Sequence, residues 1–121
     1  MEKVLIIEDD KDNLFILGYC IERLLVEVIA RSQIVPICEI IRIMPGLIML
    51  DHWIDKENGS DLCLEIKNDP RTCHIPVVLV SAVINLEEIA KESCADDHIN
   101  KPYDLEDVEY IVKKYLDLKP V

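Results

Sequence analysis

Four consecutive apolar residues, Leu47–Leu50, follow a Pro–Gly pair and lead directly into Asp51. Short, unbroken apolar runs are typical of strands that are buried on both faces, as in a parallel sheet. A carboxylate at the end of such a strand is costly unless something at that place requires a charge. Open parallel sheets bind ligands beyond the carboxyl ends of their strands. The run therefore predicts a parallel sheet with Asp51 at its functional edge.

Short apolar runs alternate with segments of helical spacing along the whole chain. The runs predict strands over residues 4–7, 27–30, 47–51, 75–80 and 97–99. The helical segments cover residues 12–26, 34–43, from 60 or 61 to 68, 86–93, and from 104 or 105 onward. Strands that alternate with helices favour an α/β fold with a parallel sheet covered on both faces. A length of 121 residues predicts a single domain, residues 1–121.

Acidic and amide side chains mark the starts of two predicted helices. Asp10 is the expected N-cap of the first helix, with Asp12 as the alternative, because carboxylates bind the free N–H groups there. Asn85 and Glu88 have the spacing of a capping box at the start of the fourth helix. These signals predict where the first and fourth helices begin.

The starts of the second and third helices are marked less directly. Pro36 is compatible with the first turn of the second helix, where no intrahelical donor is lost. Residues 52–60 are polar and are expected to be irregular, ending in a turn at Asn58–Gly59. Ser60 or Asp61 is then the expected cap of the third helix.

The charge and the cysteines exclude several classes of protein. The net charge of −11 argues against nucleic acid and anionic membranes as direct partners. No apolar run approaches the roughly 20 residues that span a bilayer, and the N-terminus lacks the layout of a signal peptide. Five cysteines without a CxxC spacing make a zinc site or a secreted disulfide framework improbable. We therefore expect a cytoplasmic protein with reduced thiols.

Polar side chains follow four of the predicted strands. Glu8 and Asp9 come after the first strand, Asp51 ends the third, Ser81 ends the fourth and Lys101 follows the fifth. Carboxylates that converge repel each other and call for a cation, and a set of oxygen ligands suits Mg²⁺. A carboxylate nucleophile, a hard cation, a hydroxyl and a lysine together suit phosphoryl transfer. The alternative is that each acid only caps a loop or a helix.

Several stretches resemble response-regulator receiver domains, over essentially the whole chain. They are VLIIEDD at 4–10, PGLIMLD at 45–51, IKNDPRTCHIPVVLVSA at 66–82 and ADDHINKPYD at 95–104, with Gly59 eight residues after Asp51. The resemblance implies a flavodoxin-like, doubly wound fold, with a central five-stranded parallel sheet in the order 2-1-3-4-5. It also implies a role in two-component signalling.

The resemblance assigns roles around Asp51. Asp51 corresponds to the phosphoacceptor, and Glu8 and Asp9 correspond to the acidic pair that binds Mg²⁺. Of this pair, Asp9 is the one expected to contact the metal directly. The main-chain carbonyl of Trp53 corresponds to a further metal ligand. Lys101 corresponds to the lysine that contacts the phosphoryl group.

The resemblance also assigns the switching residues. Ser81 corresponds to the hydroxyl residue of the site, and His98 stands where the family has an aromatic switch residue, usually Tyr or Phe. A histidine that is simply satisfied in the core is the alternative for His98. The Lys101–Pro102 bond corresponds to a cis peptide, which is inexpensive only before proline.

Besides His98, two positions depart from the family's pattern. Asp55 replaces the usual proline four residues after the phosphoacceptor, so we expect a looser loop there. Cys94 takes the place of a usual glycine, in a segment between residues 82 and 101 that is about two residues shorter than usual. Cys94 and the shorter segment bear on the fourth helix, which is often the signalling surface of the family.

We expect a stand-alone receiver that accepts a phosphoryl group from a histidine kinase or a phosphotransfer protein and signals to a downstream protein. It would catalyse only its own phosphorylation and dephosphorylation, and a homodimer is an open alternative. A pseudo-receiver that acts as a scaffold, and a receiver piece of a larger hybrid kinase or regulator, are the other interpretations. A phosphatase of the haloacid-dehalogenase kind is rejected because Trp53 stands where those enzymes have a second aspartate.

Overall fold

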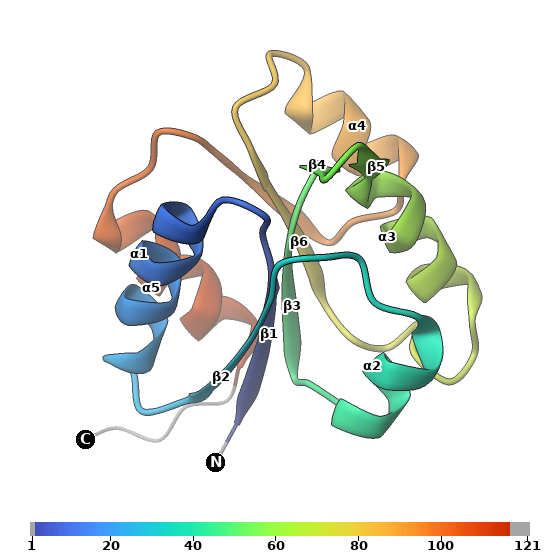
Figure 1. The fold of residues 1–121 in the computed structure, drawn as a ribbon, viewed down its shortest axis with the longest axis horizontal. Helices are drawn as coiled ribbons and strands as arrows, with labels where there is room; N and C mark the ends of the chain where they lie inside the picture. Colours follow the sequence, from blue (N-terminus) through green and yellow to red (C-terminus); the bar gives the residue numbers. More distant parts are fainter. Residues whose placement is uncertain (1, 117–121) are drawn as a thin grey trace.

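The computed structural model describes residues 2–116, which form a five-stranded parallel sheet with helices on both faces (Figure 1). The sheet has the order β2-β1-β3-β6-β7. Its strands are β1 (Lys3–Ile7), β2 (Glu27–Arg31), β3 (Leu47–Asp51), β6 (Val77–Ser81) and β7 (Asp97–Asn100). The helices are α1 (Lys11–Glu22), α2 (Ile37–Ile43), α3 (Gly59–Asn68), α4 (Leu86–Glu92) and α5 (Leu105–Tyr115). Counted within this sheet, the order is the predicted 2-1-3-4-5, so the doubly wound fold is confirmed.

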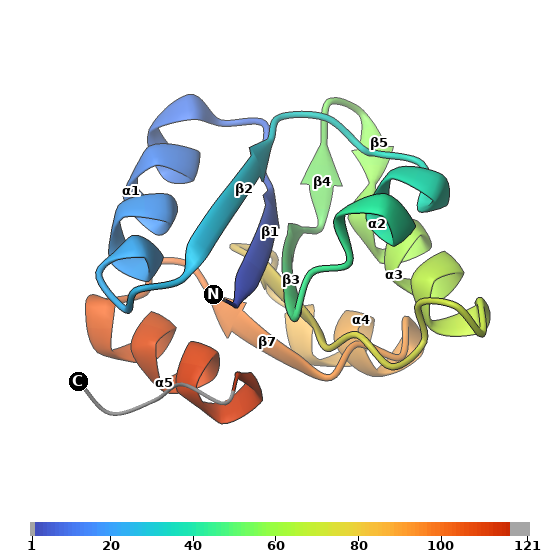
Figure 2. The same ribbon diagram turned by 90° about the horizontal axis from the view of Figure 1, so that it is seen from below.

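The central strands are buried on both faces because every residue of their apolar runs enters one of two cores. Leu5 and Ile7 of β1 face the core under α2, α3 and α4, whereas Val4 and Ile6 face the core under α1 and α5. Figure 2 shows these two groups of helices on opposite sides of the sheet. Within residues 2–116, the helices are all too short or too polar to cross a bilayer. The five cysteines are free thiols.

The register of the parallel strands brings their carboxyl ends to one edge. Ile7 lies beside Leu50, so Glu8 follows β1 at the level of Asp51. Asp51 in turn lies beside Val80, one residue before the end of β6. The polar residues at the ends of these strands therefore face the same space, as predicted.

Two helices are shorter than predicted. α1 ends at Glu22 instead of residue 26, and Leu25 adopts a left-handed backbone with φ of 62° and is exposed. α2 begins at Ile37 instead of residue 34, with Pro36 as an extended N-cap before the helix rather than in its first turn. Residues before a proline avoid the helical region, which explains why Val35 cannot extend the helix backwards.

Of the predicted helix N-caps, one is confirmed and two are wrong. The cap at Asp10 is confirmed, because its carboxylate accepts the N–H groups of Asp12 and Asn13. The capping box at Asn85 is wrong: its backbone is not extended, and its side chain makes no capping hydrogen bond. The cap of α3 is Asn58, which accepts the N–H of Ser60, so the prediction of Ser60 or Asp61 is wrong as well.

The stretch predicted to be irregular contains a small hairpin. Strands β4 (Trp53–Ile54) and β5 (Glu57–Asn58) pair in antiparallel fashion. The two residues between them, Asp55 and Lys56, both have positive φ, 44° and 68°, as in a type I′ turn. Proline is restricted to φ near −65° and could not adopt this turn at position 55. Asp55, which replaces the usual proline, thus lies in a two-residue hairpin turn.

Replacing Cys94 by glycine is expected to stabilise the fold. Cys94 is exposed and has φ of 62°, a conformation that strains any residue with a Cβ. Glycine removes this strain without loss of packing, and we expect a gain of about 1 kcal/mol in the free energy of unfolding. Urea unfolding measures it, with Cys94→Ala as the control that keeps the Cβ. Equal stability of the two variants would show that the backbone there is not strained.

Candidate functional site

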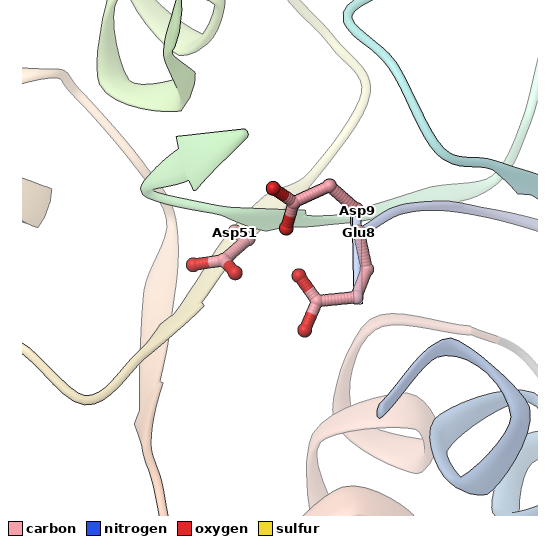
Figure 3. A group of neighbouring side chains, drawn as sticks. All are labelled: Glu8, Asp9 and Asp51. Carbon is pink, nitrogen blue, oxygen red and sulfur yellow. The ribbon is translucent and has the colours of Figure 1, made fainter. Parts of the chain in front are cut away.

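Three carboxylates lie together at the carboxyl edge of the sheet, as the strand ends predicted. Glu8 and Asp9 follow β1, and Asp51 ends β3; their side chains point into a common space (Figure 3). One oxygen of each carboxylate lies within 4.8 Å of the others. Glu8 is buried, Asp51 is half-buried and Asp9 is exposed, so the cluster opens from the sheet toward solvent. Three negative charges this close repel each other unless a cation lies among them.

Lys101 supplies one positive charge to this cluster. Its Nζ donates a hydrogen bond of 2.7 Å to Glu8 Oε1 and lies 3.4 Å from Asp51 Oδ2. The backbone N–H of Lys101 donates to the carbonyl of Ser81, which fixes the start of this segment against β6. Burial alone would lower the pKa of Lys101, but the hydrogen bond to Glu8 and the charge of Asp51 outweigh it and raise the pKa. The lysine is therefore positively charged at neutral pH.

One of the two carboxylate oxygens of Glu8 makes no hydrogen bond within residues 2–116. The residue is 3% exposed, and its Oε2 is buried without a hydrogen-bond partner among residues 2–116. Burial and the nearby Asp51 carboxyl raise the pKa of Glu8, while Lys101 opposes the shift. A buried, unpartnered carboxylate oxygen beside two further carboxylates is a set of hard oxygen donors that fits Mg²⁺. Glu8, Asp9 and Asp51 are the residues that would hold it.

The other predicted site residues lie around this cluster. Ser81 ends β6 and is 5% exposed, and its Oγ accepts the N–H of Val83 at 3.4 Å. The N–H of Trp53 lies 3.5 Å from Asp51 Oδ1, which places the start of the hairpin directly beside the predicted phosphoacceptor. His98 is half-buried in β7, away from the carboxylates, and borders a surface hollow formed with α5. The predicted cis peptide before Pro102 is confirmed.

The hairpin of β4 and β5 reaches across to the acidic pair. The backbone N–H of Asp55, at the hairpin tip, donates a hydrogen bond of 2.9 Å to Asp9 Oδ2. Sequence reasoning missed this contact, because it joins residues that are 46 positions apart and uses a main-chain group. The two consecutive positive φ angles that aim this N–H occur without a glycine or an asparagine to indicate them.

Gly59 fixes the other end of the hairpin against Asp51. Its N–H donates to the carbonyl of His52 at 2.6 Å. A methyl group on Gly59 would overlap the carbonyl oxygen of Asp51 and lie 3.0 Å from its carbonyl carbon. Only glycine lets the start of α3 come this close to the strand that carries Asp51.

Replacing Gly59 by alanine is therefore expected to destabilise the protein by about 3 kcal/mol, because backbone atoms must move to make room. Urea unfolding measures the loss. Gly18→Ala in α1 is the matched control, since a methyl group there would lie 3.8 Å from Val28 Cγ1, an ordinary contact. Alanine favours a helix over glycine, so this control should gain about 0.5–1 kcal/mol. A Gly59→Ala protein as stable as wild type would contradict the tight contact.

The fold and the site together define a class of protein: a doubly wound α/β domain with an acidic crevice suited to a cation and a lysine at the carboxyl edge of its sheet. Residues 4–113 match the family of response regulator receiver domains. This match covers most of the chain, and the chain belongs to that family. It is a receiver domain of the kind found in two-component systems.

Known relatives agree with this assignment. The DNA-binding dual master transcriptional regulator RpaA of Synechocystis sp. is 30% identical over 117 residues, which cover 89% of this chain but only 46% of the regulator. The chain thus spans less than half the length of this curated relative. A 36% identity over 78 residues relates it to Histidine kinase P4 of Formosa agariphila, over 61% of this chain and 6% of the kinase.

Solved structures support the fold. A putative response regulator from Chloroflexus aurantiacus J-10-fl superimposes with a TM-score of 0.86 at 21% identity, covering 94% of this chain and 96% of that one. The receiver domain of the sensor histidine kinase PA1611 from Pseudomonas aeruginosa PAO1 gives a TM-score of 0.79 at 16% identity, with the same coverage. That domain has a magnesium ion coordinated in its active site cleft.

Proposed function

We propose that this receiver domain accepts a phosphoryl group on Asp51 from a histidine kinase or a phosphotransfer protein in the cytoplasm. The observation that carries the proposal is the convergence of Lys101 and three carboxylates on one crevice, with Lys101 Nζ 3.4 Å from Asp51 Oδ2. A carboxylate held beside a charged ammonium group suits the reaction, because negative charge on the phosphoryl oxygens must be stabilised as the group is transferred.

The step itself is a displacement at phosphorus. A carboxylate oxygen of Asp51 forms a bond to phosphorus while the bond from phosphorus to the donor's histidine nitrogen breaks. The ammonium group of Lys101 moves from the Asp51 carboxylate to an oxygen of the phosphoryl group. The Ser81 hydroxyl donates a hydrogen bond to another phosphoryl oxygen. Glu8, Asp9, Asp51 and the main-chain carbonyl of Trp53 would hold Mg²⁺, which would supply further positive charge to the site.

The signal is a change in conformation that follows phosphorylation. Ser81 lies within the rim of the site, and its backbone carbonyl is already bonded to the N–H of Lys101. When the hydroxyl turns toward the phosphoryl group, the loop after β6 follows it, and His98 in the neighbouring strand β7 changes its packing. The output is a changed surface near α4 and β7 that binds a downstream protein.

A second candidate function is a scaffold without phosphorylation. The features that favour it are His98 in place of an aromatic switch residue and Asp55 in place of proline. Both candidates need the same fold, so only the chemistry of Asp51 separates them.

Intact-mass measurement after treatment with acetyl phosphate tests the proposed function. We expect the mass of one phosphoryl group to appear with Mg²⁺ and to be absent when the cation is chelated. Beryllofluoride with Mg²⁺ should shift the backbone amide resonances around Asp51 and Ser81. A protein that gains no mass and shows no shift under either treatment is a scaffold.

A further inference from the structure

The outer edge of the sheet at β2 has no partner strand. β2 pairs with β1 on one side, and within residues 2–116 no strand pairs with its other side. Figure 1 shows β2 in the foreground between α1 and α2, with neither helix crossing it. Ala30, in the second half of the strand, is exposed. Uncovered edges of this kind readily pair with another strand.

The backbone groups on this edge belong to Val28 and Ala30. Glu27 donates its N–H to the carbonyl of Glu2, and the carbonyl of Arg31 accepts the N–H of Glu8, so both residues point their backbone groups toward β1. Backbone direction alternates along a strand, and Val28 and Ala30 therefore point outward. The carbonyl of Ala30 accepts a hydrogen bond from the Arg31 side chain, which leaves its second lone pair available.

The sequence of β2, Glu-Val-Ile-Ala-Arg, is complementary to itself in the antiparallel direction. If two copies pair about Ile29, Val28 of one copy lies opposite Ala30 of the other, and their outward N–H and carbonyl groups meet. Glu27 of each copy then lies opposite Arg31 of the other, on one face of the joined sheet. Shifting the register by two residues would keep the hydrogen bonds but lose both ion pairs. The charges thus select a single register.

Apolar surface lies beside the same edge. A groove of about 360 Å³ runs between α1 and β2 and is lined by Phe15, Tyr19, Val28 and Ala30. Phe15 and Tyr19 are 75% and 62% exposed. In a pair of strands related by a two-fold axis perpendicular to the sheet, both α1 helices lie on the same face. Phe15 and Tyr19 of each copy would then cover the groove of the other copy across the seam, the line where the two β2 strands pair.

We propose that two copies of this chain associate through antiparallel pairing of their β2 strands, centred on Ile29, with Glu27 and Arg31 as reciprocal ion pairs. Arg31 also donates to Glu39 of α2 at 3.0 Å, and its guanidinium has further donors for Glu27 of the second copy. This association lies on the far edge of the sheet from β7. The proposed dimer does not depend on phosphorylation at Asp51, so the two proposals can be tested separately.

Sedimentation equilibrium at concentrations up to about 1 mM tests the proposal. We expect the wild-type chain to form a dimer that dissociates on dilution. Glu27→Arg places two arginines opposite each other at both ends of the seam and should weaken the dimer about tenfold or more. Arg31→Glu should weaken it in the same way by opposing two glutamates. Mixed together, the two variants form complementary pairs at both ends, and a heterodimer of wild-type strength should return.

The mixture separates this interface from a loss of folding, since a misfolded variant gains nothing from its complement. A second measurement does not depend on either charge variant. In the proposed register, Ile29 of one copy lies opposite Ile29 of the other, on the two-fold axis. Ile29→Cys should therefore form a disulfide between copies on mild oxidation, which mass spectrometry can map. Gly18→Cys in α1 should form none. A wild-type chain that stays monomeric, a dimer indifferent to Glu27→Arg, or a mixture without recovery would overturn the proposal.

Discussion

Asp51→Asn is expected to remove phosphorylation completely, while leaving the fold intact. The amide has the size of the carboxylate, so it can still lie beside Lys101, but it lacks the negatively charged oxygen that attacks phosphorus. It also removes one of the three carboxylates of the cluster, so the affinity for Mg²⁺ should fall as well. Intact mass after acetyl phosphate and Mg²⁺ measures the first effect, and quenching of Trp53 fluorescence by Mn²⁺, used in place of Mg²⁺, measures the second.

Asp61→Asn is the matched control for this variant. Asp61 lies in the first turn of α3 and is exposed, outside the acidic cluster, so its replacement should leave phosphate uptake unchanged. Peptide mapping completes the experiment. Phosphate found on the Asp51→Asn protein at another residue would show that Asp51 is not the acceptor.

Trp53→Asn combined with Val83→Glu is expected to shorten the lifetime of the phosphorylated protein. The resemblance to the family implies that the residues two after the phosphoacceptor and two after Ser81 would control the water that attacks phosphorus from the side opposite Asp51. Neither Trp53 nor Val83 offers a carboxylate or an amide group to orient this water. More than half of the Trp53 side chain is exposed, so it shields the site only in part. The missing polar groups therefore account for most of the effect, about 10²-fold in the rate of hydrolysis.

The decay of phosphorylated protein without a kinase measures this rate. Trp53→Phe with Val83→Ile is the control, because it changes the same positions without adding a polar group, and its decay should stay as slow as that of wild type. If wild type lost its phosphate as fast as the polar double variant, these two side chains would have no part in the lifetime.

The parallel sheet and the acidic cluster could be predicted because both depend on short-range patterns. An unbroken apolar run such as Leu47–Leu50 has few structures open to it other than a buried strand. Once the strands are parallel, their carboxyl ends lie along one edge of the sheet, and the strand order implied by the resemblance to receiver domains then brings Glu8, Asp51 and Lys101 together. The contact between Lys101 and both acids follows from that geometry.

The ends of the helices and the hairpin could not be predicted, because they depend on backbone conformations that the residue types do not reveal. Leu25 and Met44 have positive φ after α1 and α2, although neither is glycine or asparagine. Asp55 and Lys56 form a type of turn that usually contains Asn-Gly. The Asn-Gly pair of this sequence, Asn58–Gly59, instead supplies the N-cap and the first residue of α3. At the start of α3 a tertiary contact decides, the tight contact of Gly59 with Asp51.

The hydrogen bond from the hairpin tip to Asp9 gives the chain a built-in probe of its own site. The Asp55 amide proton points at an oxygen of Asp9, one of the three carboxylates that would hold a cation. The chemical shift of this proton therefore responds to the cation directly, while more distant amides respond only through movement of the backbone. A titration followed at this single amide reports the occupancy of the crevice separately from the conformational response, without any label attached to a side chain.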